Sequence, residues 1–174
     1  MSHVVIIGIC AIIGISMSKV RRKKGPVIAK KVVYKGTTFA SGLEKYMFIA
    51  LMEAGIEFKY EGYTYELVPA FTFINNCVER QSNGKGDFIN RGNKKVLNLK
   101  YTPDFVGEDF IIETKGRAND SFPLRWKLFK KWMHDNNDDR TLYKPQNQKE
   151  CDETIRMILF ERSQKQGKNM LKDK

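Results

Sequence analysis

The sequence is poor in the side chains that most often build zinc sites and disulfide frameworks. It has two histidines and three cysteines, and Cys10, Cys77 and Cys151 lie far apart without a Cys-x-x-Cys pair. Scattered cysteines are typical of a reducing compartment, and so few soft ligands argue against a zinc finger or a histidine-centred metal motif. If the protein binds a metal ion, its ligands are expected to be oxygen atoms.

A hydrophobic run long enough to cross a membrane is also missing. The apolar run at residues 4–15 is shorter than the roughly 20 residues that a spanning helix needs. The positive charge at 19–24 follows this run, whereas a signal peptide carries positive charge before it. Two interpretations stay open: Met17 is the true start, or residues 1–17 form a weak membrane anchor. We favour the first, and expect no stable membrane association and a cytoplasmic main domain.

Acidic residues are few relative to basic ones. The chain of 174 residues has 31 Lys and Arg against 20 Asp and Glu, a formal net charge of +11. This balance favours a polyanionic partner, either nucleic acid or an anionic membrane surface, over a merely basic soluble protein. Hydrophobic content of 41% and aromatic content of 11% indicate one folded domain with a core of its own.

Two short motifs in the middle of the chain carry the most information about chemistry. Residues 101–105 read Tyr-Thr-Pro-Asp-Phe, and residues 110–116 read Phe-Ile-Ile-Glu-Thr-Lys-Gly. Two apolar runs around a short turn predict a β-hairpin. Side chains alternate along a strand, so Glu113 and Lys115 share a face that Asp104 reaches from the neighbouring strand. Two carboxylates and one ammonium in a small volume predict a site for Mg²⁺ and a phosphate.

These motifs resemble those of the PD-(D/E)xK nuclease superfamily, and within it phage endonuclease I, the Holliday-junction resolvases, and related phage nucleases. The matching pieces are Phe-Ala-Ser-Gly-Leu-Glu at 39–44, then 101–105 and 113–116, and a weaker likeness continues to about residue 135. The three pieces are fairly specific in this order and spacing. The resemblance implies an α/β, restriction-endonuclease-like αβββαβα core, with a central mixed sheet flanked by helices.

The resemblance also implies roles for individual residues. Asp104 and Glu113 would bind Mg²⁺, or Mn²⁺ in its place, and the backbone carbonyl of Thr114 would reach the same ion. Lys115 would orient the attacking water or stabilise charge beside the scissile phosphate. Glu44 would complete the site, often for a second ion. The alternative is that these residues have no catalytic role. Asp104 would then be an ordinary aspartate at the end of a strand, and Glu113 and Lys115 would form an exposed ion pair on a solvated face.

Glu44 has a competing structural explanation. Ser41 and Glu44 have the spacing of a capping box, which satisfies backbone donors at a helix start without any catalytic meaning. At about 100° per residue, however, Glu44 falls between Phe48 and Leu51, inside the apolar arc of the helix predicted over 41–54. A carboxylate that faces the core needs a partner, and a metal site would supply one. Both interpretations stay open.

The remaining patterns predict the domain organisation. We divide the chain into a basic arm before residue 39, a nuclease domain at 39–163, and a basic tail at 164–174. Residues 75–98 are rich in turn formers and charge, and we interpret them as an insertion that holds a small hairpin or contacts substrate. A helix is predicted to begin near residue 121, with an apolar face of Leu124, Leu128, Phe129, Trp132 and Met133. A last helix is predicted over 150–163, with Ile155, Ile158 and Leu159 buried.

Basic residues after the hairpin are candidates for contacts with DNA phosphates. They are Arg117, directly beyond Lys115, and Arg125, Lys127, Lys130 and Lys131 on the polar side of the next helix. A solvated helix face is an equally weighted explanation for the helical ones.

The motifs together with the resemblance imply a metal-dependent endonuclease that hydrolyses DNA phosphodiesters, and the resemblance alone implies the most specific form of this hypothesis, a Holliday-junction resolvase. Cutting a branched junction needs two active sites, hence a homodimer. A nicking or duplex endonuclease of phage replication or packaging is the alternative, and a nucleic-acid-binding protein without catalysis is a second one. If a phage encodes the chain, its location is the host cytoplasm.

Overall fold

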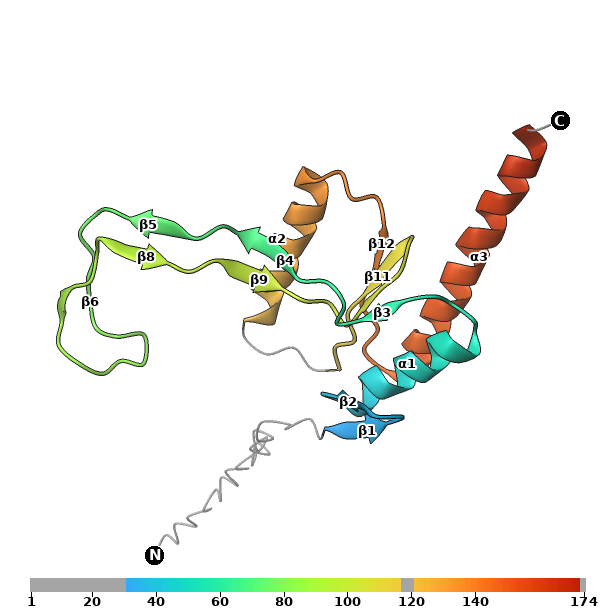
Figure 1. Ribbon diagram of the computed structural model, residues 1–174, viewed down its shortest axis with the longest axis horizontal. Helices are drawn as coiled ribbons and strands as arrows, with labels where there is room; N and C mark the ends of the chain where they lie inside the picture. The colour runs from blue at the N-terminus through green and yellow to red at the C-terminus, as the bar shows by residue number, and fades with distance from the viewer. Residues whose placement is uncertain (1–30, 117–120, 173–174) are drawn as a thin grey trace, which may run out of the picture.

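The computed structural model describes residues 31–116 and 121–172, with side chains up to residue 167. Within these residues the fold is mixed α/β, with three helices around a four-stranded mixed sheet (Figure 1). This confirms the expected general α/β class. Residues 1–30, which hold the apolar run and the basic arm, and Arg117 lie outside the described residues. In the described part of the chain, no helix combines the length and the apolar character needed to cross a bilayer.

Four short strands form the central sheet. In spatial order they are β12 (Thr141–Tyr143), β11 (Phe110–Ile112), β10 (Phe105–Val106) and β3 (Lys59–Tyr60). β11 and β12 run parallel, and the other neighbouring pairs are antiparallel. A parallel pair needs a long crossover connection, and this crossover contains helix α2 (Phe122–Asp135).

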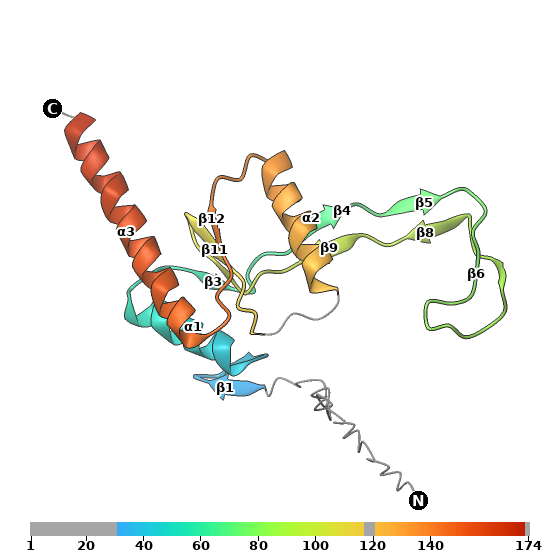
Figure 2. The ribbon, with the colours of Figure 1, turned by 180° about the vertical axis from the view of Figure 1, so that it is seen from behind.

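Helices cover both faces of the sheet (Figures 1 and 2). Helices α1 (Gly42–Glu53) and α3 (Gln148–Lys172) pack on one face, and α2 packs on the other. Side chains alternate along β11, so Phe110 and Ile112 join the buried cluster of α1 and α3, whereas Ile111 joins that of α2. Because both faces are covered, the strand can be apolar throughout.

The hairpin of β10 and β11 turns at Gly107, where the sequence predicted it. The Gly107 amide donates to the Phe110 carbonyl at 2.9 Å. A Cβ atom on Gly107 would lie 2.3 Å from the Phe110 ring, so this close approach requires glycine. The antiparallel register of the two strands places Asp104 and Glu113 opposite each other, at the mouth of the hairpin.

A two-stranded antiparallel ribbon continues outward from β3 and β10 (Figure 1). Nearest the sheet, β4 (Tyr65–Val68) pairs with β9 (Leu99–Tyr101). Farther out, β5 (Phe71–Phe73) pairs with β8 (Lys94–Val96), and at the end β6 (Val78–Glu79) pairs with β7 (Ile89–Asn90). The segment 75–98, predicted as an insertion with a small hairpin, is therefore the outer part of a longer ribbon. A separate hairpin of β1 (Val32–Tyr34) and β2 (Thr37–Phe39) leads into α1.

Two predictions about helix faces and ends are wrong. Helix α3 extends well beyond the predicted range of 150–163 and includes most of the predicted tail. Leu159 was expected to be buried but is 45% exposed, and Leu124 on α2 is 62% exposed. Both leucines point away from the stripe that contacts the sheet, since successive helical residues are rotated by about 100°. On α3 this stripe consists of Cys151, Thr154 and Ile158.

Candidate functional site

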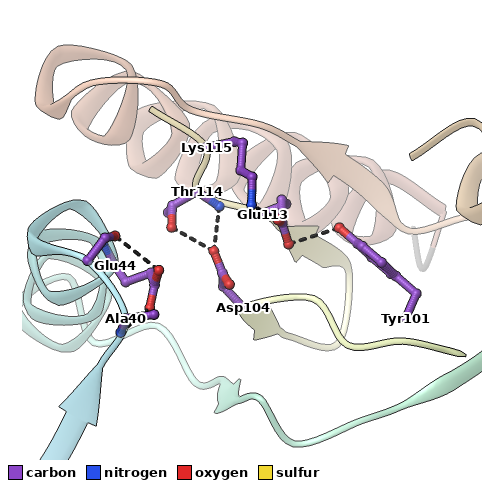
Figure 3. Close-up of polar contacts among 8 residues, drawn as sticks. Ala40, Glu44, Tyr101, Asp104, Glu113, Thr114 and Lys115 are labelled. Carbon is purple, nitrogen blue, oxygen red and sulfur yellow. Dashed lines mark hydrogen bonds and ion pairs between the residues drawn. The ribbon is translucent and has the colours of Figure 1, made fainter. Parts of the chain in front are cut away.

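Residues from several elements line one open cavity of about 360 Å³ at the mouth of the β10–β11 hairpin. Its lining includes Glu44 from α1, Asp104 and Glu113 from the two sides of the hairpin, Lys115 just beyond it, and Arg125 from α2. All four predicted catalytic side chains thus reach one cavity (Figure 3), although they are far apart in the sequence.

Asp104 lies directly before β10 and is held by Thr114 on the neighbouring strand. One carboxylate oxygen, Oδ2, accepts hydrogen bonds of 2.6 Å from both the backbone amide and the hydroxyl of Thr114 (Figure 3). Within the described residues, Oδ1 accepts no hydrogen bond. Burial and the negative charge of Glu113 raise the pKa of Asp104 to about 8, although the hydrogen bonds from Thr114 act in the opposite direction.

Glu113 follows the buried strand β11 and is 5% exposed. Its Oε2 accepts a hydrogen bond of 2.8 Å from the Tyr101 hydroxyl, and its Oε1 lies 3.6 Å from the Lys115 ammonium. Burial raises the pKa of Glu113, while the Tyr101 hydrogen bond and the charge of Lys115 lower it. The prediction that this carboxylate is buried because it follows an apolar run is confirmed.

Glu44 takes part in the cap of helix α1 and also faces the cavity, so both structural expectations for it are met. A variant of the capping box is formed: the Ser41 hydroxyl accepts from the Glu44 amide at 3.1 Å, and Glu44 Oε2 accepts at 2.9 Å from the amide of Ala40, the residue before the N-cap. The carboxylate is also only 7% exposed and lines the cavity, on the same helix face as Met47 and Leu51. The cap is therefore part of the structure, and metal binding by Glu44 stays a prediction.

Two tyrosines that were not predicted as site residues donate hydrogen bonds to the carboxylates of Glu44 and Glu113. Tyr101 donates to Glu113, and Tyr60 on β3 donates to Glu44 Oε2 at 3.0 Å. Burial and the nearby carboxylate raise the pKa of each phenol, so both stay protonated donors. A buried phenol hydroxyl needs an acceptor, but Tyr60 and Tyr101 each follow a lysine in a short strand, so the sequence gives no signal of their burial.

Lys115 lies between the acids and an aromatic ring. Its ammonium is 4.8 Å from the centre of the Phe122 ring and 3.6 Å from Glu113, and the side chain is 29% exposed. The ammonium therefore contacts both the buried carboxylate and the open cavity. Lys115 is accessible to a ligand without losing its partner.

The charges at the site do not balance. Three carboxylates, those of Glu44, Asp104 and Glu113, share the cavity with the cations Lys115 and Arg125 and with exposed Lys100 and Glu61 on its rim. In the arrangement of the described residues, no group of three or more His, Cys, Asp or Glu side chains is placed to hold a metal ion. The paired carboxylates of the hairpin are nevertheless hard oxygen donors, and Mg²⁺ usually needs one or two of these together with waters and substrate phosphate. The donor chemistry fits this ion.

The basic residues predicted to contact DNA have different environments. Arg125 lines the cavity, and Lys127 is exposed on α2. The Lys130 ammonium lies 5.7 Å from the Trp126 ring, and Lys131 pairs with Asp135 at 2.8 Å. Only Arg125 among the described ones lies next to the carboxylates.

Comparison of the chain with family models, curated proteins and solved structures finds no match.

Proposed function

We propose that the protein is a metal-dependent endonuclease of the PD-(D/E)xK type that hydrolyses phosphodiester bonds in DNA. The observation that carries the proposal is the convergence of Asp104, Glu113 and Lys115 on one cavity, with the pKa of both carboxylates raised. Burying like charges side by side costs free energy, and such pairs occur mostly where a ligand or a reaction uses them.

The order of elements supports the restriction-endonuclease-like core. Read along the chain, the helices and the strands of the central sheet follow as α1, β3, β10, β11, α2, β12 and α3, the αβββαβα order that the resemblance implies. Fold order alone assigns no activity, so the proposal rests on the site.

Each residue of the site has a proposed task. Asp104 and Glu113 would bind Mg²⁺ through Oδ1 and Oε1, the oxygens that Thr114 and Tyr101 leave open. When bound, the ion lowers the pKa of a water and stabilises negative charge on the phosphate. Lys115 is placed to orient the attacking water or to contact the phosphate. Arg125 would hold a neighbouring phosphate and so position the strand.

The substrate is proposed from charge and from the resemblance. A net charge of +11 favours a polyanion. Within the described residues each chain has one such cluster of catalytic candidates, so cutting both strands of a junction would take two chains. We propose a branched-DNA resolvase that acts as a homodimer in the cytoplasm, with Mg²⁺ or Mn²⁺. A nicking or duplex endonuclease would use the same chemistry.

The test is cleavage of a four-way junction, a linear duplex and a single strand, each with Mg²⁺, with Mn²⁺ and with EDTA. Wild type is compared with Asp104→Ala and Glu113→Ala, and Glu108→Ala is the matched control because Glu108 is exposed at the other end of the same hairpin. We expect metal-dependent cutting that both site variants lose and the control keeps. DNA binding without cutting, unchanged in all variants, would instead indicate a binding protein.

A further inference from the structure

The outer part of the ribbon, residues 71–97, has no core of its own. We call it the distal ribbon; it projects away from the sheet and helices in both views (Figures 1 and 2). Every residue of this segment is exposed except Cys77, Arg91 and Gly92. A two-stranded ribbon is marginally stable by itself in water, so a segment of this length without a covering layer indicates a partner.

The distal ribbon is nevertheless a built structure. Gly92 passes so close to the opposite strand that a Cβ atom would lie 1.9 Å from the Asn75 carbonyl oxygen. The Asn90 side chain accepts from the amides of Cys77 and Gly92 at 3.0 and 2.9 Å. These contacts give the end of the ribbon a defined hooked shape.

The guanidinium groups at this end are fixed by the backbone. Arg80 donates to the Gly86 carbonyl at 3.2 Å, and Arg91 donates to the carbonyls of Glu79 and Asp87 at 3.2 and 3.3 Å. Both guanidinium groups are thereby oriented without an acidic side chain as hydrogen-bond partner. Their positive charge therefore remains available to a ligand.

Basic residues outnumber acidic ones in the distal ribbon. The distal ribbon has the five cations Arg80, Lys85, Arg91, Lys94 and Lys95 against the two acids Glu79 and Asp87. A cavity of about 660 Å³ on the inside of the hook is lined by three of these cations, Arg80, Arg91 and Lys94, and by one of the acids. The aromatic ring of Phe73 also lines it. Cations beside an exposed aromatic ring are suited to a nucleic-acid backbone and its bases.

We propose that the distal ribbon is a second DNA-binding element, which holds the sugar–phosphate backbone at a distance from the catalytic cavity. The proposal rests on the proposed function in that DNA is the substrate. A two-stranded β-ribbon fits the major groove of B-DNA, and cationic side chains on its flanks reach the phosphates on either side. A second copy of the chain is the less favourable partner, because two ribbons of net positive charge repel each other.

The length of the ribbon sets where the contact falls. At roughly 3.3 Å per residue, the strand from Asp104 back to Ile89 extends at most about 50 Å. Because B-DNA rises about 3.4 Å per base pair, the ribbon would contact duplex up to about 15 base pairs, or one and a half helical turns, from the cleavage point. DNA arms much shorter than this would not reach it.

The experiment measures binding without cleavage, in EDTA, to a four-way junction with arms of 20 base pairs, at several salt concentrations. The variant is Lys94→Gln/Lys95→Gln, since both side chains are exposed and neither forms an ion pair within the described residues. The control is Lys149→Gln/Lys165→Gln, which removes the same charge from exposed positions on α3. We expect the ribbon variant to weaken binding about tenfold and to reduce the slope of log K against log salt by about 2, with the control close to wild type.

Shorter DNA separates this contact from a general loss of charge. On junctions with arms of about 6 base pairs, the ribbon variant should bind like wild type. Equal binding of the ribbon variant and its control on long arms would overturn the proposal. The two proposals fail in different ways. If cleavage depends on metal and on Asp104 but the ribbon variant binds like its control, only the ribbon proposal fails. If the ribbon variant weakens DNA binding but the protein does not cleave, only the proposed nuclease function fails.

A second variant tests the alternative partner. Phe88→Ser/Leu97→Ser removes two side chains that are 66% and 77% exposed at the distal ribbon. If this variant changed the sedimentation of the protein from dimer to monomer while DNA affinity stayed at the wild-type value, a second copy would cover the ribbon. That result would overturn the DNA contact.

Discussion

Replacing Asp104 by asparagine is expected to stabilise the metal-free protein while abolishing cleavage. Asparagine keeps a carbonyl oxygen that accepts from Thr114, so the hydrogen bonds of 2.6 Å that fix this position have a replacement. The substitution removes a negative charge that burial and Glu113 disfavour. A structural aspartate would behave in the opposite way, because its loss would cost stability.

The magnitude follows from the raised pKa. The pKa of Asp104 is raised from 3.8 to about 8, so the folded state holds its proton more tightly than the unfolded state. The contribution of Asp104 to the free energy of unfolding is therefore greatest below pH 3.8 and falls as the pH rises to about 8. At about 1.4 kcal/mol per pKa unit the upper limit of this loss is roughly 5–6 kcal/mol. Because the charge of Glu113 contributes to this shift and the cavity is open to solvent, we expect Asp104→Asn to gain only about 1–3 kcal/mol at pH 8.

The assay is urea unfolding between pH 5 and pH 8 in EDTA, with Asp109→Asn as the matched control. Asp109 forms an ion pair of 2.7 Å with Arg162, whose hydrogen bond lowers the pKa of that carboxyl. Its contribution is present above its unfolded pKa, so the control is expected to lose about 0.5–1 kcal/mol at neutral pH. The gain of Asp104→Asn should grow from pH 5 to pH 8. A loss of stability in this variant across the whole range would refute the argument from repulsion.

Three further outcomes are expected. Tyr101→Phe keeps the ring but removes the donor to Glu113, so the affinity for Mn²⁺ measured by calorimetry should fall about tenfold, while Tyr143→Phe, away from the cavity, should leave it unchanged. Glu44→Gln preserves a capping box, so stability should stay within about 0.5 kcal/mol; undiminished cleavage would then assign this residue to the cap alone. Ca²⁺ at ten times its dissociation constant should stabilise wild type by about 1.4 kcal/mol in thermal unfolding, and a similar shift in Glu113→Gln would place the ion elsewhere.

The hairpin and its acids were predictable because the signals are local. Two apolar runs around a glycine turn indicate two strands, and the apolar run before Glu113 indicates its burial. Helical geometry likewise placed Glu44 on the buried face of α1, and its 7% exposure agrees. In each case the decisive contacts lie within one hairpin or one helix.

Features that depend on partners distant in the sequence were not predictable in this way. The ribbon pairs residues up to 38 positions apart, as in the contact of Thr64 with Thr102, and a turn-rich, charged segment gives no period by which to find it. The hydroxyl of Tyr60 finds its acceptor on α1, which only the packed fold reveals. Leu159 was expected on the buried face of α3, but the neighbouring Ile158 faces the core and Leu159 is 45% exposed, so packing decides which face of the helix is covered.

The arrangement of the acids also bears on how the site assembles during folding. Eight residues separate Asp104 from Glu113, so the acid pair is brought together when one short hairpin closes, an event of about 1–10 μs. Glu44 comes from a helix 60 positions earlier in the chain and joins them only after α1 docks on the sheet, a slower step with a larger loop to close. The repulsive half of the site is thus formed first. Divalent ions present during refolding would act on that early hairpin as well as on the finished protein.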